Sequence, residues 1–257
     1  MTAFYLKLLI TPLLMLSISL AAKRWGTAIG GLLSGLPVTS ASVMLFLSLE
    51  QGPGFAVQAV PGALAGVAAI QATYLFYFVV TRKLSALPGC ITALLFYAVA
   101  AALMSGLGSM SLSILATLCL ITAIVIATSK KTDTDTAGYV PVPRWIIPMR
   151  MLTATLLLLA ITAGAEWLGP VASGFLAPIP VIAWPLAVFA HVHGGRSELG
   201  AIVRGNAIGA VGVVGFYLTL KYMALQWGIA ATITAGVLLA VVLTAGLAAL
   251  LKPKATS

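Results

Sequence analysis

The chain has 257 residues, of which 61% are hydrophobic and only 7% are charged, with a formal net charge of +9. A soluble domain carries charge on roughly a quarter of its residues, because those side chains cover its surface. The composition therefore excludes a soluble globular protein and predicts an integral membrane protein whose surface faces lipid. The basic residues lie between apolar runs, so we assign them to orientation in the bilayer and not to binding nucleic acid.

Nine apolar segments approach the length of roughly 20 residues that crosses a bilayer. They lie near residues 4–22, 27–49, 55–81, 87–105, 110–128, 147–166, 170–192, 199–222 and 227–250. No signal-peptide cleavage site follows the first segment, so we expect it to remain as a span. The fourth and fifth segments are separated only by residues 106–110, where one long tilted span is the alternative. The fold class expected is an all-α membrane protein with about nine transmembrane helices.

The charges between these segments predict the orientation of the chain. With nine crossings, ten basic residues gather on one side, and only Lys7 and Lys221 lie near the other. The ten are Lys23, Arg24, Arg82, Lys83, Lys130, Lys131, Arg144, Arg196, Lys252 and Lys254. The positive-inside rule places this side in the cytoplasm, with the N-terminus outside and the C-terminus inside. We expect a multi-pass protein of the bacterial cytoplasmic (inner) membrane, with the polar stretch 129–145 as a cytoplasmic linker.

The two halves of the chain align without a gap when residue n is set against residue n+143. Residues 30–52 align with 173–195, and the alignment continues through the following segment in each half. Identical pairs include Pro37/Pro180, Gly52/Gly195, Gly62/Gly205, Gly66/Gly209 and Tyr74/Tyr217. The domains expected are a four-span repeat at 1–108, a connector span and linker at 109–145, and a second repeat at 146–257. An offset of five spans inverts the second repeat, which is a recurrent transporter architecture.

The second repeat contains GFLAPIPVIAWPLAVFAHVHGG followed by ELGAIVRGNAIGAVGVVGFYL. In these runs it resembles the GlpM family of small four-helix bacterial membrane proteins. The points of similarity are Gly174, Pro178, Pro180, Ala183, Ala190, His191, Arg204, Tyr217 and Leu218. The first repeat departs from the pattern at Gly35, Ser48 and Pro61, which stand in place of Pro178, His191 and Arg204. The resemblance implies two such units fused in opposite orientations, and it implies no particular chemistry.

Two prolines predict where a substrate binds. Pro37 and Pro180 lie about ten residues into their segments, near the bilayer midplane, where proline removes a helical hydrogen bond. Two interrupted helices of opposite orientation would bring two helix N-termini, each with partial positive charge, to the same depth. Neighbouring side chains that we assign to this substrate site are Thr39, Ser40, Ser42 and Trp184. The ligand predicted is anionic or carries an anionic group; the alternative is a pair of ordinary kinks satisfied by neighbouring helices.

Further polar residues lie inside the apolar segments. Arg204 and Asn206 lie one to two turns into the eighth segment and are assigned to the same substrate site. Alternatively, Arg204 reaches the cytoplasmic headgroups. Gln71 lies deep in the third segment. We expect it either to line a cavity or to join two helices by a hydrogen bond.

The end of the seventh segment is rich in titratable groups, namely His191, His193, Arg196 and Glu198. If transport is coupled to protons, the candidates are His191, Glu198 and Glu50, which lies at the pseudo-symmetric outer end. The alternative is ordinary interface polarity. We expect no metal site and no cofactor, because the histidines lack a third ligand and Cys90 and Cys119 are isolated.

The function expected is a small secondary transporter or exporter that moves an anion-bearing small molecule through a midplane site. The inverted repeat, the twin interruptions and the absence of a P-loop favour this class. The alternatives are a flippase or scramblase for an anionic lipid or lipid-linked precursor, a membrane-embedded enzyme, and an accessory subunit. We find no pair of catalytic groups at one depth, so we expect no enzyme. Partners expected are the small-molecule substrate and the bilayer; assembly into a homo-oligomer is left open.

Overall fold

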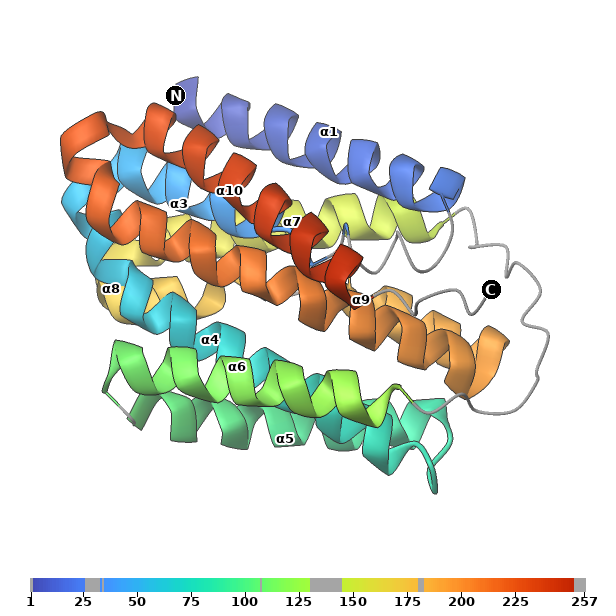
Figure 1. The fold of residues 1–257 in the computed structure, drawn as a ribbon. Coiled ribbons are helices and arrows are strands. Elements are labelled where there is room, and N and C mark those ends of the chain that lie inside the picture. The colour runs from blue at the N-terminus through green and yellow to red at the C-terminus, as the bar shows by residue number, and fades with distance from the viewer. Residues whose placement is uncertain are drawn as a thin grey trace.

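The fold is described from a computed structural model of the chain (Figure 1). The structure describes residues 2–25, 33, 35–106, 108–129, 145–179 and 183–251. These residues form helices and the turns that join them, and no strand occurs among them. The prediction of an all-α protein is therefore confirmed for the described part of the chain.

Six helices follow predicted segments closely, whereas α3, α8 and α9 differ from the predicted segments 27–49, 170–192 and 199–222. They are α1 (Thr2–Trp25), α3 (Val38–Gln51), α4 (Pro53–Val80), α5 (Ala86–Gly106), α6 (Met110–Ala127), α7 (Ile146–Ala163), α8 (Ala165–Leu176), α9 (Ala183–Trp227) and α10 (Ile229–Leu250). Five stretches among the described residues are long and apolar enough to cross a membrane, namely α4, α5, α6, α10 and Gly195–Trp227 of α9. These apolar helices indicate a multi-pass membrane protein.

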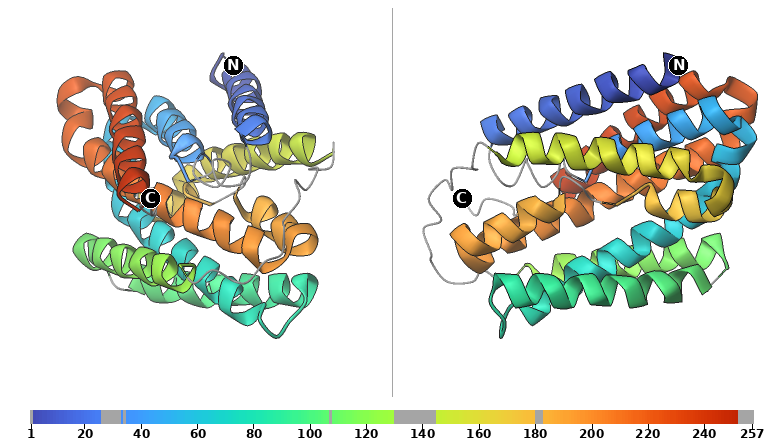
Figure 2. Two further views of the ribbon diagram at one scale, coloured as in Figure 1. Left: turned by 45° about the vertical axis from the view of Figure 1, so that its right-hand side comes forward. Right: turned by 180° about the vertical axis from the view of Figure 1, so that it is seen from behind.

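The centre of the bundle is formed by α4 and α9, and the other helices cover them (Figure 1, Figure 2). Most of the apolar window of α4 is buried, whereas α5, α6 and α10 are mostly exposed. The exposed residues on these outer helices are large and apolar; Leu87 is 73% exposed and Val242 is 66% exposed. Such a surface suits lipid and would be costly in water.

Two glycines that lie 143 positions apart in the sequence make sharp turns. Gly52 separates α3 from α4 with φ 89° and ψ 158°. Gly195 interrupts α9 with φ 66° and ψ −159°. Because only glycine adopts a positive φ without steric cost, both turns depend on this residue type. Gly195 divides α9 into a short arm, residues 183–194, and a long arm, Gly195–Trp227, which is longer at both ends than the predicted segment 199–222.

The described residues contain a turn directly before α3 and another directly after α8. Residues 35–37 form a turn, and α3 begins at Val38, directly after Pro37. In the second repeat, α8 ends at Leu176 and α9 begins at Ala183. Pro178 lies in the turn that follows α8. Pro180 lies outside the described residues, so its predicted role is not addressed by the structure.

Candidate functional site

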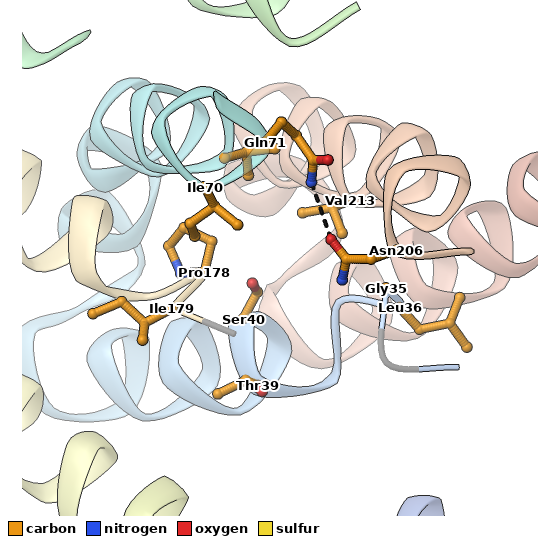
Figure 3. Close-up of a pocket in the computed structure, with 11 residues that line it drawn as sticks. Gly35, Leu36, Thr39, Ser40, Ile70, Gln71, Pro178, Ile179, Asn206 and Val213 are labelled. Carbon is orange, nitrogen blue, oxygen red and sulfur yellow. Dashed lines mark hydrogen bonds between the residues drawn. The ribbon is translucent and has the colours of Figure 1, made fainter. Parts of the chain in front are cut away.

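A small cavity lies where α3 begins, between α4, the end of α8 and the long arm of α9 (Figure 3). Its volume is about 40 Å³. This space accommodates about three water-sized molecules. The residues that line this polar cavity are Gly35, Leu36, Thr39, Ser40, Val67, Ile70, Gln71, Pro178, Ile179, Asn206 and Val213. Thr39, Ser40 and Asn206 had been predicted as site residues, and the structure brings these three together.

Two buried amides form the polar part of the wall (Figure 3). The Gln71 Nε2 group donates a hydrogen bond to Asn206 Oδ1 at 3.2 Å, and the two residues are 2% and 5% exposed. Gln71 Oε1 is buried and has no hydrogen-bond partner among the described residues. An unsatisfied buried acceptor costs about 1–3 kcal/mol, so the structure keeps this amide buried at a cost. Gln71 therefore both joins two helices and lines the cavity.

The two amides of the polar cavity lie at a similar height in the bundle. Gln71 precedes the end of α4 by nine residues, and Asn206 follows Gly195 by eleven residues. At 1.5 Å per residue these positions are about 14 Å and about 16 Å from the same end of the bundle. The cavity thus lies inside the bundle, nearer to the end of α4 than to its start.

One helix N-terminus faces this cavity. Pro37 occupies the N-cap position of α3, and no side chain caps the helix there. The N–H groups in the first turn of a helix lack intrahelical partners and carry partial positive charge. Thr39 and Ser40, in that turn, line the cavity. Ser42 is directed elsewhere, because its hydroxyl donates to the Val38 carbonyl oxygen of its own helix at 3.1 Å.

A larger, apolar cavity of about 260 Å³ lies beside the polar one. It is lined by Ile70, Thr73, Tyr74, Leu94, Tyr97, Thr153, Leu157, Ile179, Trp184 and Pro185. Ile70 and Ile179 line both cavities. Trp184, predicted for the polar site, lines the apolar one instead, with its ring 5.6 Å from that of Tyr74 and 5.2 Å from that of Tyr77.

Arg204 does not line either cavity. Its Nη1 donates hydrogen bonds to the Val125 carbonyl oxygen at 2.8 Å and to Ser129 Oγ at 3.0 Å. These acceptors lie at the C-terminal end of α6, where the unpaired carbonyls of a helix favour a cation. The structure thus gives Arg204 hydrogen-bond partners at the end of α6.

The proposed proton-coupling residues are not gathered into one site. The Tyr77 hydroxyl and His191 Nδ1 are 3.2 Å apart. Glu198 Oε2 is buried without a hydrogen-bond partner among the described residues. Arg196 Nη1 donates to the Phe78 carbonyl oxygen at 3.0 Å and lies 4.5 Å from the centre of the Phe78 ring. The side chain of His193 is not among those that the structure describes. Among the described residues, no group of three His, Cys, Asp or Glu side chains could hold a metal ion.

Glu50 belongs to a buried ion pair that sequence reasoning missed. Lys7 is 4% exposed, and its Nζ lies 2.5 Å from Glu50 Oε1 and donates to Thr162 Oγ1 at 2.7 Å. The pair links α1, α3 and α7. The sequence carries one signal for this pair, because Lys7 lies inside the first apolar segment and on the same predicted side as Glu50.

Comparisons with known proteins find no match to this chain among family models, curated proteins or solved structures. The similarity to the GlpM family therefore stays an expectation based on the motif residues between 174 and 218. Any function has to be inferred from the geometry of the two cavities and the residues around them.

Proposed function

We propose that this protein is a small secondary transporter whose substrate passes through the polar cavity. The observation that supports this most directly is the buried Gln71–Asn206 pair with its unpartnered Gln71 oxygen. Polar groups at this depth are costly in lipid and generally face a cavity or the interior of the bundle. Interrupted backbone at membrane depth is likewise tolerated only where protein or a cavity surrounds it. Both features meet at this cavity.

The transporter has nine crossings arranged as two inverted repeats. At an offset of 143, α5 (86–106) corresponds to 229–249, and α10 spans Ile229–Leu250. The N-terminus of α7 likewise falls near the position equivalent to that of α1. The equivalent helices α4 and the long arm of α9 run antiparallel, since Gln71 contacts Asn206 whereas Phe78, later in α4, contacts Arg196, earlier in α9. Antiparallel equivalent helices are what an inverted repeat requires.

Reciprocal packing of the two interruptions supports the same relation. Gly35 and Pro178 are equivalent positions, as are Gly66 and Gly209. A Cβ atom placed on Gly35 would lie 2.9 Å from the Gly209 Cα atom, and one on Gly66 would lie 2.9 Å from Pro178 Cγ. Each interruption therefore packs on the glycine motif of the other repeat. The polar cavity lies between these two contacts, which is where a pseudo-two-fold axis would pass.

The recognised group is polar and accepts hydrogen bonds from the start of α3. The described residues that line the cavity include no charged side chain. Burying a full charge without a counter-ion is costly, and Arg204 is engaged elsewhere. A neutral or weakly charged group that also donates to Gln71 fits this lining better than the full anion expected from sequence.

The orientation that we propose keeps the basic end in the cytoplasm of a bacterial cell. Arg82, Lys83 and Arg196 lie at the end of the bundle where α4 finishes and the long arm of α9 begins. Lys7 and Glu50 lie at the opposite end. This distribution supports a cytoplasmic basic end by the positive-inside rule.

A thermal-stability screen tests the substrate site. Purified protein would be heated with a panel of small neutral and anionic solutes, and any stabilising solute would be tested for counterflow in proteoliposomes. We expect Gln71→Leu and Asn206→Leu to remove the stabilisation and the counterflow. Gln58→Leu, the same change at an exposed position of α4, should remove neither. Equal responses of all three variants would contradict the proposal.

Lipid handling is the second candidate, and one observation favours it. The apolar cavity reaches Leu94 and Thr153, which are exposed on the outer helices α5 and α7. A cavity that opens toward lipid would admit an acyl chain from the side. A flippase or scramblase should then respond to lipid and not to soluble solutes.

A further inference from the structure

The apolar cavity adjoins the polar cavity in a way that suggests one ligand for both. Ile70 and Ile179 form the boundary, because each lines both spaces. Ile70 precedes Gln71 on α4, so a molecule bound beside the Gln71 amide has the apolar cavity as its neighbour. The described lining of this second space is almost entirely apolar.

A second residue with an unpartnered buried group lies on the same helix. Tyr74 is 1% exposed, lines the apolar cavity, and its hydroxyl has no hydrogen-bond partner among the described residues. Tyr74 follows Gln71 by three residues, and residues three apart lie on the same face of a helix. One face of α4 therefore carries two residues that each have a buried, unsatisfied polar atom, and one of these residues lines each cavity. The polar cavity can hold water, whereas an apolar cavity usually stays dry.

The size and position of the apolar cavity limit what it can hold. Its volume is about 260 Å³, and an apolar cavity of about 150 Å³ is known to bind benzene. It therefore holds a ring or a short alkyl group, and it is too small for the two acyl chains of a bilayer lipid. Trp184 and Tyr74 supply an aromatic wall suited to such a group.

We propose that the substrate is a small amphiphile whose polar group occupies the polar cavity while its ring or short alkyl group occupies the apolar cavity. This inference rests on the proposed transport function, and it names the substrate class. The apolar part enters between α5 and α7, where Leu94 is 54% exposed. A molecule of this kind partitions into the bilayer and reaches the opening from there.

Fluorescence of Trp184 tests the proposal without knowledge of the natural substrate. A variant that keeps Trp184 and carries phenylalanine at Trp25, Trp145, Trp167 and Trp227 reports on the apolar cavity alone. The probe is 4-bromobenzyl alcohol, whose bromine quenches a nearby indole. Bromobenzene, which lacks the polar group, and a brominated phosphatidylcholine are the comparison probes.

We expect saturable quenching by 4-bromobenzyl alcohol, with bromobenzene binding roughly tenfold more weakly because it loses the hydrogen bonds of the polar cavity. Leu157→Phe fills the apolar cavity and should remove the saturable phase. Leu156→Phe, the same change at the neighbouring position, which is 56% exposed and outside the cavity, should leave it intact. Thr153→Phe at the rim gives the same test should Leu157→Phe fail to fold.

The outcomes separate this inference from the transport function. Non-saturable quenching, or saturable quenching that both Leu157→Phe and Thr153→Phe leave unchanged, overturns the inference. Saturable quenching by the brominated lipid alone also overturns it and favours lipid handling. A small polar solute could instead stabilise the protein and undergo counterflow equally well in the wild type and in Leu157→Phe. That result would support transport and contradict an amphiphilic substrate. Saturable binding of the alcohol without counterflow of any solute would contradict transport and leave the two-cavity site standing.

Discussion

Lys7 and Glu50 form an ion pair in which the lysine side chain is buried and the glutamate side chain is partly exposed. The side chains are 5% and 28% exposed, and Thr162 takes a further hydrogen bond from Lys7. Breaking a buried ion pair at one partner costs 3–5 kcal/mol, whereas replacing both partners by apolar residues is often close to neutral. Because the Glu50 carboxylate is partly exposed, we place Lys7→Met at the lower end of that range.

We predict that Lys7→Met lowers the free energy of unfolding by about 3 kcal/mol. The double variant Lys7→Met/Glu50→Met should recover most of this loss. Equilibrium denaturation of the purified variants in mixed micelles measures the free energy of unfolding of the single and the double variant. A double variant as unstable as Lys7→Met alone would mean that the ammonium stabilises the fold through Thr162 and Phe46 and not through the carboxylate.

Arg204 gives a second prediction at the scale of a residue. Arg204→Gln removes the donor at the C-terminus of α6, and we expect a loss of about 1–2 kcal/mol in unfolding free energy. Solute stabilisation in the thermal screen should stay unchanged, because Arg204 does not line the cavity. A Gln variant that is stable but no longer binds the solute would restore the role in anion recognition that the sequence suggested.

The packing of α8 against α4 depends on two glycines. A Cβ atom on Gly62 would overlap the Val171 carbonyl oxygen, and one on Gly174 would overlap the Ala59 carbonyl oxygen. Forcing atoms into such a contact typically costs 1–3 kcal/mol. We therefore predict that Gly62→Ala and Gly174→Ala each lower the midpoint of thermal unfolding by several degrees. Gly246→Ala, with no atom near its added Cβ, should be neutral or slightly stabilising; an equal loss there would contradict this account.

Helix existence could be predicted from sequence, because a stretch of apolar residues in lipid must satisfy its own backbone. The predicted segment 110–128 matches α6 (Met110–Ala127), and the interruption after Pro37 follows from the chemistry of proline. Which faces meet could not be predicted. In a membrane protein both the lipid-facing and the buried faces are apolar, so periodicity says little about contacts. The Gln71–Asn206 bond joins residues 135 positions apart, and the partners of Lys7 and Arg204 are likewise distant.

At the scale of the whole molecule, the proposed repeats form one interlocked unit. Gly35 of the first repeat packs on the second, and Pro178 of the second packs on the first. The cavity between them is small, and Ser40 in its wall is only 3% exposed. A carrier built this way has to open to each side in turn, by movement of one repeat against the other.

Two-sided accessibility of position 40 tests this central claim most directly. Ser40→Cys would be made in a variant with alanine at Cys90 and Cys119, and sealed membrane vesicles would be treated with a membrane-impermeant thiol reagent from either side. Lys83→Cys and Glu166→Cys serve as references for the cytoplasmic and the outer side, and Thr117→Cys, fully buried on α6, serves as the unreactive control. We predict that Ser40→Cys reacts from both sides, more slowly than either reference, and that the references react from opposite sides. A cysteine at position 40 that reacts from neither side, or from one side only, would contradict alternating access through this cavity.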